Sequence, residues 1–109
     1  MAYNKTNEQQ IDTLIRSWPN IEKKKMFGGV CYLTRGNMCF GIWQDYLIVR
    51  TDPATAQQQM LKDFVRPFDV TGKPMKGWFM VASEGWSTDE SMNTWLLMGR
   101  DFAWTLPEK

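Results

Sequence analysis

The sequence predicts a two-layer α+β fold in which an antiparallel sheet carries helices on one face. Helix signals occur near the beginning, the middle and the end of the 109 residues. Short apolar runs separated by turn residues fill the two intervals between them. The expected order is helix, three strands, helix, two strands, helix, which suits helices packed on one face of a sheet. The length fits a single domain over residues 1–109.

The first helix is expected to begin at Thr6, because Gln9 follows three residues later in capping-box spacing. Pro19 ends the helix, since proline disfavours helical geometry in the residue before it. Apolar residues between these limits have the spacing i, i+3, i+4, i+7, which predicts one buried stripe. They are Ile11, Leu14, Ile15 and Trp18.

An antiparallel meander is expected between Lys23 and Arg50. Gly28 and Gly29 lie inside this stretch and predict a kink in its first strand, because missing side chains allow a bulge or a close backbone approach. Short apolar runs separated by turn residues form the expected strands. These runs are residues 30–33, 38–43 and 46–49.

Asp52 and Pro53 predict the start of a second helix, which should run to about Lys62. Aspartate accepts hydrogen bonds from the free amides of a helix start, and proline at the first helical position loses no hydrogen bond. Pro67 indicates that the next strand lies at an edge of the sheet or is short, since proline cannot donate to a neighbouring strand. Two strands are expected, over residues 64–70 and 77–81, with a turn between them.

The last helix is expected to follow a loop at residues 83–85 and to run to about Trp104. Ser87 and Glu90 have the spacing of a capping box and mark its start. Apolar residues at helical spacing predict that one face of this helix is buried. They are Met92, Trp95, Leu96, Phe102 and Ala103.

The charges and the missing residue types limit the possible functions. Thirteen basic and 12 acidic residues give a net charge of +1, so the chain has no global field that would hold nucleic acid indiscriminately. The sequence contains no histidine, the commonest general base near neutral pH and the commonest metal ligand. We therefore expect a protein that binds and does not catalyse, with no cofactor and no metal ion. An enzyme is the remaining alternative, because carboxylates, lysines and tyrosines can also transfer protons.

The cysteines and the hydropathy indicate a cytoplasmic protein without membrane contact. Cys31 and Cys39 do not have the spacing of a CxxC pair, and we expect both to be reduced, structural thiols. Whether they face each other depends on the register of the hairpin, which the sequence leaves open. No apolar stretch approaches the roughly 18 residues that span a bilayer, and the first ten residues are polar where a signal peptide is apolar.

Short motifs recur along the chain in a characteristic order. They are KMFGGV at residues 25–30, GNM at 36–38, DYLIVR at 45–50, RPF at 66–68, TGKPM at 71–75 and the apolar run at 78–81. Together they resemble the N-terminal domain of the TfoX family of competence regulators. The resemblance covers about residues 23–81 by motif and the whole chain by the order of its elements.

This resemblance implies a two-layer α+β fold related to that of secretion-chaperone-like domains. It also implies a setting in bacterial competence regulation, where full-length members promote the expression of DNA-uptake genes. Those regulators carry a second, C-terminal domain that the resemblance does not include. The resemblance implies the fold more directly than the regulatory role, because function resides in sites that sequences sharing a fold need not share. It brings no catalytic residues.

Two basic features are candidates for binding. Lys23, Lys24 and Lys25, together with Arg16 and Arg35, are candidates for a patch that contacts the phosphates of nucleic acid. The alternative, which we favour, is a solvated entrance to a strand, since Glu22 dilutes the charge. Nucleic acid is therefore the second partner class that we consider, after protein.

Arg50 and a glycine-containing motif are further candidates. Arg50 follows three apolar residues, and a partly buried guanidinium needs a carboxylate, a carbonyl or a bound anion; we expect an internal ion pair. Met26, Phe27, Gly28 and Gly29 lack the longer spacing of phosphate-binding loops, and we expect this motif to form a structural bend.

Trp86 is the expected anchor for a protein partner. It is one of six tryptophans and lies among glycine and serine residues, which predicts an exposed loop. Most of the other tryptophans are expected in the core, as are most of the eight methionines. We therefore expect a protein-interaction or regulatory module, with a homodimer as one possible form.

Overall fold

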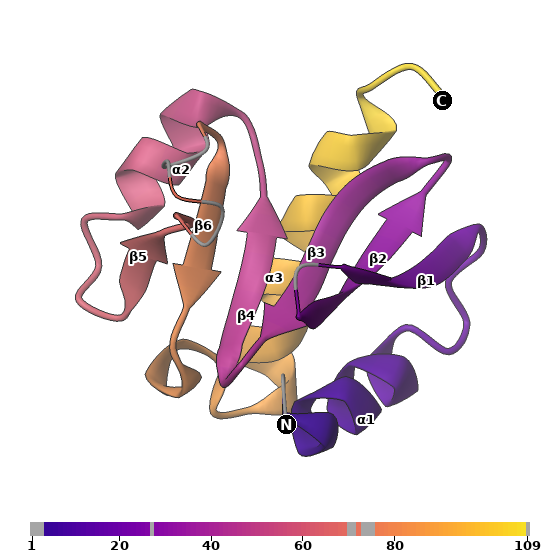
Figure 1. Cartoon of the computed structure of the whole chain (residues 1–109), viewed down its shortest axis with the longest axis horizontal. Coiled ribbons are helices and arrows are strands. Elements are labelled where there is room, and N and C mark those ends of the chain that lie inside the picture. Colours follow the sequence, from indigo (N-terminus) through magenta and orange to yellow (C-terminus); the bar gives the residue numbers. More distant parts are fainter. Residues whose placement is uncertain (1–3, 27, 70–71, 73–75, 109) are drawn as a thin grey trace.

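The structure is a computed structural model that describes residues 4–26, 28–69, 72 and 76–108. Figure 1 shows the helices and strands formed by these residues. Their order is α1 (Lys5–Leu14), β1 (Ile21–Met26), β2 (Gly29–Thr34), β3 (Asn37–Trp43), β4 (Tyr46–Arg50), α2 (Pro53–Gln59), β5 (Val65–Pro67), β6 (Trp78–Val81), the short 3-10 helix η1 (Ser83–Trp86) and α3 (Asp89–Trp104).

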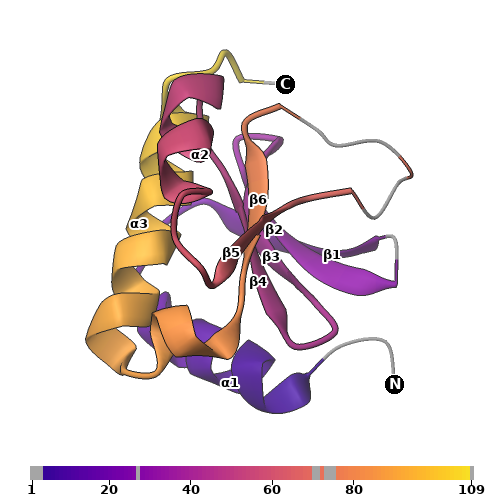
Figure 2. The same ribbon diagram turned by 90° about the vertical axis from the view of Figure 1, so that its left-hand side faces the viewer.

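The strands form one antiparallel sheet in the order β1-β2-β3-β4-β6-β5. Strands β1 and β5 are therefore its two edges, and the edge position of β5 agrees with the presence of Pro67. Seen from the side, α2 and α3 lie along one face of the sheet (Figure 2). The predicted α+β class, with an antiparallel sheet and helices on one face, is confirmed. Within the described part of the chain, no helix has the length and hydropathy that crossing a bilayer requires.

The kinked first strand of the expected meander is two strands joined by a tight turn. Met26 of β1 pairs with Gly29 of β2, and Gly28 between them has φ of 80°, a conformation that glycine adopts without strain. A side chain at Gly29 would overlap the carbonyl oxygen of Ile42, so the close approach inferred from this glycine is present. Phe27 lies outside the described residues.

The helix starts follow the capping rules, with two shifts in position. Asp52 caps α2 as predicted, and its carboxylate accepts from the Thr55 amide at 3.0 Å. Helix α1 begins earlier than expected, because Asn4 accepts from two early amides in the role assigned to Thr6. Helix α3 ends at Trp104 as expected.

At the start of α3 the capping box joins Thr88 to Ser91, one position after the predicted Ser87 and Glu90. The predicted loop before it forms the single turn of η1. The strand expected over residues 64–70 is shorter than predicted, because β5 comprises Val65–Pro67 and residues 68 and 69 are not part of it. The expected turn at residues 71–74 lies outside the described residues except for residue 72.

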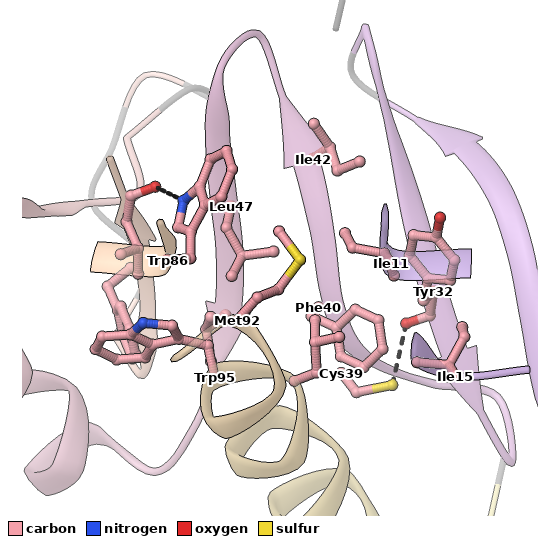
Figure 3. Packing of buried hydrophobic residues seen from close by; sticks show 14 of the residues in the cluster. Ile11, Ile15, Tyr32, Cys39, Phe40, Ile42, Leu47, Trp86, Met92 and Trp95 are labelled. Carbon is pink, nitrogen blue, oxygen red and sulfur yellow. Dashed lines mark hydrogen bonds between the residues drawn. The ribbon is translucent and has the colours of Figure 1, made fainter. Parts of the chain in front are cut away.

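All three helices bury side chains in a main core on one face of the sheet (Figure 3). Ile11 comes from α1, Ala56 from α2 and Leu96 from α3, and the strands contribute Phe40 and Leu47. A second cluster lies on the opposite face and contains no residue of a described helix. It consists of Cys31, Met38, Ile48, Phe68 and Met80, with Leu33, Trp43, Tyr46 and Trp78 packed against it.

A β-bulge fixes the faces of the two cysteines. The register between β2 and β3 shifts after Tyr32, which leaves Cys39 as an extra residue of β3. Cys39 joins the main core, where its thiol lies 3.2 Å from the carbonyl oxygen of Tyr32, and Cys31 lies in the second cluster. The two free thiols therefore lie on opposite faces of the sheet.

Candidate functional site

The sheet face opposite the helices, which carries the second cluster, is called the helix-free face below. Directly paired residues of neighbouring strands share a face, so the register assigns further side chains to it. Lys24 pairs with Cys31, Arg50 with Trp78, and Arg66 with Met80. The helix-free face thus combines aromatic side chains with Lys24 and Arg66, whereas Arg50 at the end of β4 reaches Phe102 of α3.

Trp43 and Tyr46 form a stacked pair at the end of this face. They are directly opposite each other in β3 and β4, across the turn at Gln44 and Asp45. Their ring centroids are 6.3 Å apart and their planes are inclined by 18°. Residues directly opposite each other in an antiparallel pair have Cβ atoms about 5 Å apart, which brings large rings into contact.

Asn4 fastens this turn to the start of α1. The Asn4 amide donates to the carbonyl oxygen of Gln44 at 2.9 Å, and its side-chain amide donates to the Asp45 carboxylate at 3.0 Å. Because Asn4 also caps α1, the turn and the helix share one set of hydrogen bonds. The stacked pair is therefore held on a supported turn.

Arg66 of the edge strand β5 lies beside the pair. Its guanidinium carbon is 5.9 Å from the centroid of the Tyr46 ring, within range of a cation–π contact. A cavity of about 360 Å³ adjoins these groups, a volume in the usual range of small-ligand sites. Its lining residues are Trp43, Gln44, Tyr46, Arg66, Pro67, Asp69 and Met80.

Arg50 does not form the expected internal ion pair with any described carboxylate. Its guanidinium carbon lies 5.4 Å from the ring centroid of Trp78 and 5.7 Å from that of Phe102. Burial lowers the pKa of Arg50 from its ordinary value. Two aromatic rings therefore take the place that the sequence analysis gave to a carboxylate, because the register puts Trp78 directly opposite Arg50.

The prediction that Trp86 is an exposed anchor is wrong. Trp86 is only 7% exposed and belongs to the main core. The turn of η1 folds the side chain back onto the sheet, where the indole N–H donates to the carbonyl oxygen of Val81 at 3.0 Å (Figure 3). Neighbouring glycine and serine residues indicated a loop, but they could not show the direction of its largest side chain.

The structure does not bring Lys23, Lys24 and Lys25 together as one patch. Lys23 pairs with Tyr32 and Lys25 with Val30, two residues of the main core, so both lie on the helix side, whereas Lys24 lies on the helix-free face.

Lys23 is also neutralised by two carboxylates of α1. Its ammonium lies 2.8 Å from the Glu8 carboxylate and 3.0 Å from that of Asp12. Burial by itself would lower the pKa of Lys23, but these two carboxylates raise it overall. The exposed row of lysines on an edge strand is also a common protection against pairing with another sheet.

The cysteines are poor nucleophiles in this environment. Both thiols are buried, and burial raises the pKa of Cys31 and of Cys39 to about 12. Among the described residues, no group of three or more Cys, Asp or Glu side chains is arranged to hold a metal ion. Chemically, the helix-free face can stack planar groups on its rings and attract anions to the guanidinium of Arg66.

Sequence reasoning missed this pair, although a signal was present. Trp43 and Tyr46 flank a two-residue turn, and in a hairpin such positions are direct neighbours on one face. Arg66 lies 20 residues further along the chain and joins the pair only through the pairing of β5, β6 and β4.

A family model described as the TfoX N-terminal domain matches residues 13–103, which is most of the chain. The match includes the whole of the sheet and all the residues of the stacked pair and its cavity. Neither a curated protein nor a solved structure showed significant similarity to the chain.

Proposed function

Because the chain belongs to the TfoX N-terminal domain family, we propose that it is a non-catalytic regulatory module that acts by binding. Its setting is the control of competence and DNA-uptake genes that the family resemblance implies. Its binding surface is the helix-free face of the sheet. This surface replaces Trp86, the residue on which the expectation of a protein partner depended.

The single observation that carries this proposal is the arrangement around the stacked pair. Trp43 and Tyr46 are only partly buried, Arg66 is exposed, and together they border a cavity of about 360 Å³. The three helices all pack on the other face. Aromatic and arginine side chains are the types enriched at binding surfaces, because they combine a large contact area with polar groups.

Three features support a non-catalytic role. The sequence has no histidine, and the raised pKa of both thiols, about 12, keeps them protonated near neutral pH. The carboxylates of Glu8 and Asp12 are engaged by Lys23, and Tyr32 donates to Asp12 at 2.8 Å. Groups held in this way stabilise the fold and are not poised for proton transfer.

The proposal is tested in cells that lack the gene for this chain. We expect deletion to lower the transcripts of DNA-uptake genes and the frequency of natural transformation. Complementation with the wild-type chain should restore both, whereas Trp43→Ala and Arg66→Gln should not.

Trp104→Ala is the matched control, because it removes a tryptophan that is 45% exposed at the end of α3, outside the helix-free face. We expect this variant to complement fully. Equal protein levels and native circular dichroism are required of each variant. Full complementation by both Trp43→Ala and Arg66→Gln would refute the assignment of the surface, and unchanged transcripts after deletion would refute the regulatory role.

A further inference from the structure

We infer that the helix-free face binds single-stranded nucleic acid, with bases stacking on the Trp43–Tyr46 pair and phosphates contacting Arg66. This inference rests on the proposed function, since it names the partner of the same surface. It differs from the patch considered at Lys23 to Lys25, because it uses the other end of the sheet and requires aromatic rings.

The aromatic side chains provide the stacking surface. Trp43 and Tyr46 present two nearly parallel rings beside an open cavity, and both remain partly accessible. The base of a single strand has two free π-faces and stacks on such rings with little dependence on sequence. A duplex hides these faces inside its own stack, so the geometry selects the single strand.

Arg66 provides the attraction for the backbone. It lies on this face by register and forms no ion pair with a described carboxylate. Arg66 is exposed and lies over Tyr46, which puts an anion-binding group next to the stacking surface. A guanidinium group matches the geometry of a phosphate and can also stack on a base.

Acidic side chains belong to the same region. Asp69 lines the cavity with Arg66, Asp45 lies in the turn of the stacked pair and accepts from the Asn4 side chain, and Glu22 shares the face of Lys24 because it pairs with Leu33. Among the described residues that line the cavity, Arg66 supplies the positive charge. At the cavity, Asp69 also offers an acceptor for the exocyclic amino group of a base, as carboxylates do in base recognition.

A protein partner fits the described surface less well. Large protein interfaces are anchored by contiguous apolar side chains at their centre. The exposed large apolar side chains of the described residues are Met26, Leu61 and Trp104, which are 44%, 85% and 45% exposed. They belong to β1, to the segment after α2 and to α3, so they do not gather into one patch around the cavity.

Fluorescence anisotropy with a short fluorescein-labelled oligothymidylate tests the inference. We expect saturable binding that weakens as salt is raised, and weaker binding of a duplex of the same length. Trp43→Ala should raise the Kd about fivefold or more, the effect of losing one base–aromatic stack. Trp104→Ala should leave the Kd unchanged.

Arg66→Gln keeps the test valid if Trp43→Ala does not fold, because Arg66 is exposed. It should weaken binding and lower the slope of log K against log salt by about 0.7, the value for one phosphate contact to a single strand. Arg16→Gln, on an exposed residue after α1, is its matched control and should leave the slope unchanged.

No binding of oligothymidylate by the wild type at low salt would overturn the inference. Equal or tighter binding of the duplex would overturn it too, as would equal losses in the Arg66 and Arg16 variants. These outcomes differ from failure of the proposed function. If Trp43→Ala still fails to complement while the oligonucleotide does not bind, the surface is functional but its partner is not a nucleic acid.

Discussion

The indole of Trp43 and the phenol ring of Tyr46 lie nearly parallel, with ring centroids 6.3 Å apart and an angle of 18° between their planes. The relationship follows from the register of β3 and β4, which places the two residues directly opposite each other beside their connecting turn. Asn4 holds that turn through two hydrogen bonds. The strand register and the N-terminal cap of α1 thus hold the two rings together beside the turn.

Gly99→Ala should destabilise the protein, although alanine is the better helix former. Gly99 is buried in α3, and a Cβ there would overlap the backbone carbonyl oxygen of Cys39 at the bulge of β3. Overpacking of this kind costs about 1–3 kcal/mol, whereas the same change in an exposed helix gains about 1 kcal/mol. Urea unfolding followed by circular dichroism measures the difference.

Thr94→Ala is the control for this change, because Thr94 lies on the exposed side of the same helix. Its effect should stay within about 0.5 kcal/mol. If Gly99→Ala were as stable as the wild type or more stable, the close approach of α3 to β3 would be refuted.

Trp86→Phe should also lower stability, because the indole N–H donates to the carbonyl oxygen of Val81 inside the core. Removing this donor leaves a buried carbonyl without its partner, at a cost of about 1–3 kcal/mol. In Trp104→Phe the lost hydrogen bond to Thr34 belongs to a partly exposed side chain, and the loss should be smaller. Equal unfolding midpoints for Trp86→Phe and the wild type would mean that Trp86 is exposed after all.

Cys31 and Cys39 should resist modification by Ellman's reagent in the native protein at pH 8. Their pKa values are raised to about 12 by burial, and only the thiolate reacts. The rate of modification should increase with urea in parallel with unfolding, for both thiols together. Rapid reaction of either thiol in the folded protein would contradict its burial and would reopen the question of a nucleophile.

The order of elements could be predicted because its signals are local. Asp52 and Pro53 mark a helix start through their own chemistry, and Pro67 marks an edge strand for the same kind of reason. Strand β1 was not predicted as a separate element, because Glu22 and three lysines give it no alternation of apolar and polar residues. Its backbone pairing with β2 holds it in place.

The candidate site depended on information that is not local. Which residues share a face follows from the register, including the bulge after Tyr32, and a shift by one residue would exchange the faces. Trp86 was also mispredicted from local sequence. Its polar neighbours indicated an exposed side chain, but a single turn of η1 directs the indole into the core. Arg66 reaches Tyr46 only in the assembled sheet.

The measurement that tests the binding surface most directly is a ¹H–¹⁵N NMR titration of the protein with unlabelled oligothymidylate. The six tryptophans give separate indole N–H signals, so the spectrum reports on both faces of the sheet at once. We predict that the indole signal of Trp43 shifts, together with the backbone amides of Tyr46 and Arg66. The signals of Lys23, Lys25 and Trp104 should stay in place.

Shifts confined to β1 or to the end of α3, with the Trp43 indole unmoved, would contradict the account. So would a spectrum that does not change at low salt, because the stacked pair and its guanidinium neighbour would then have no nucleic-acid ligand.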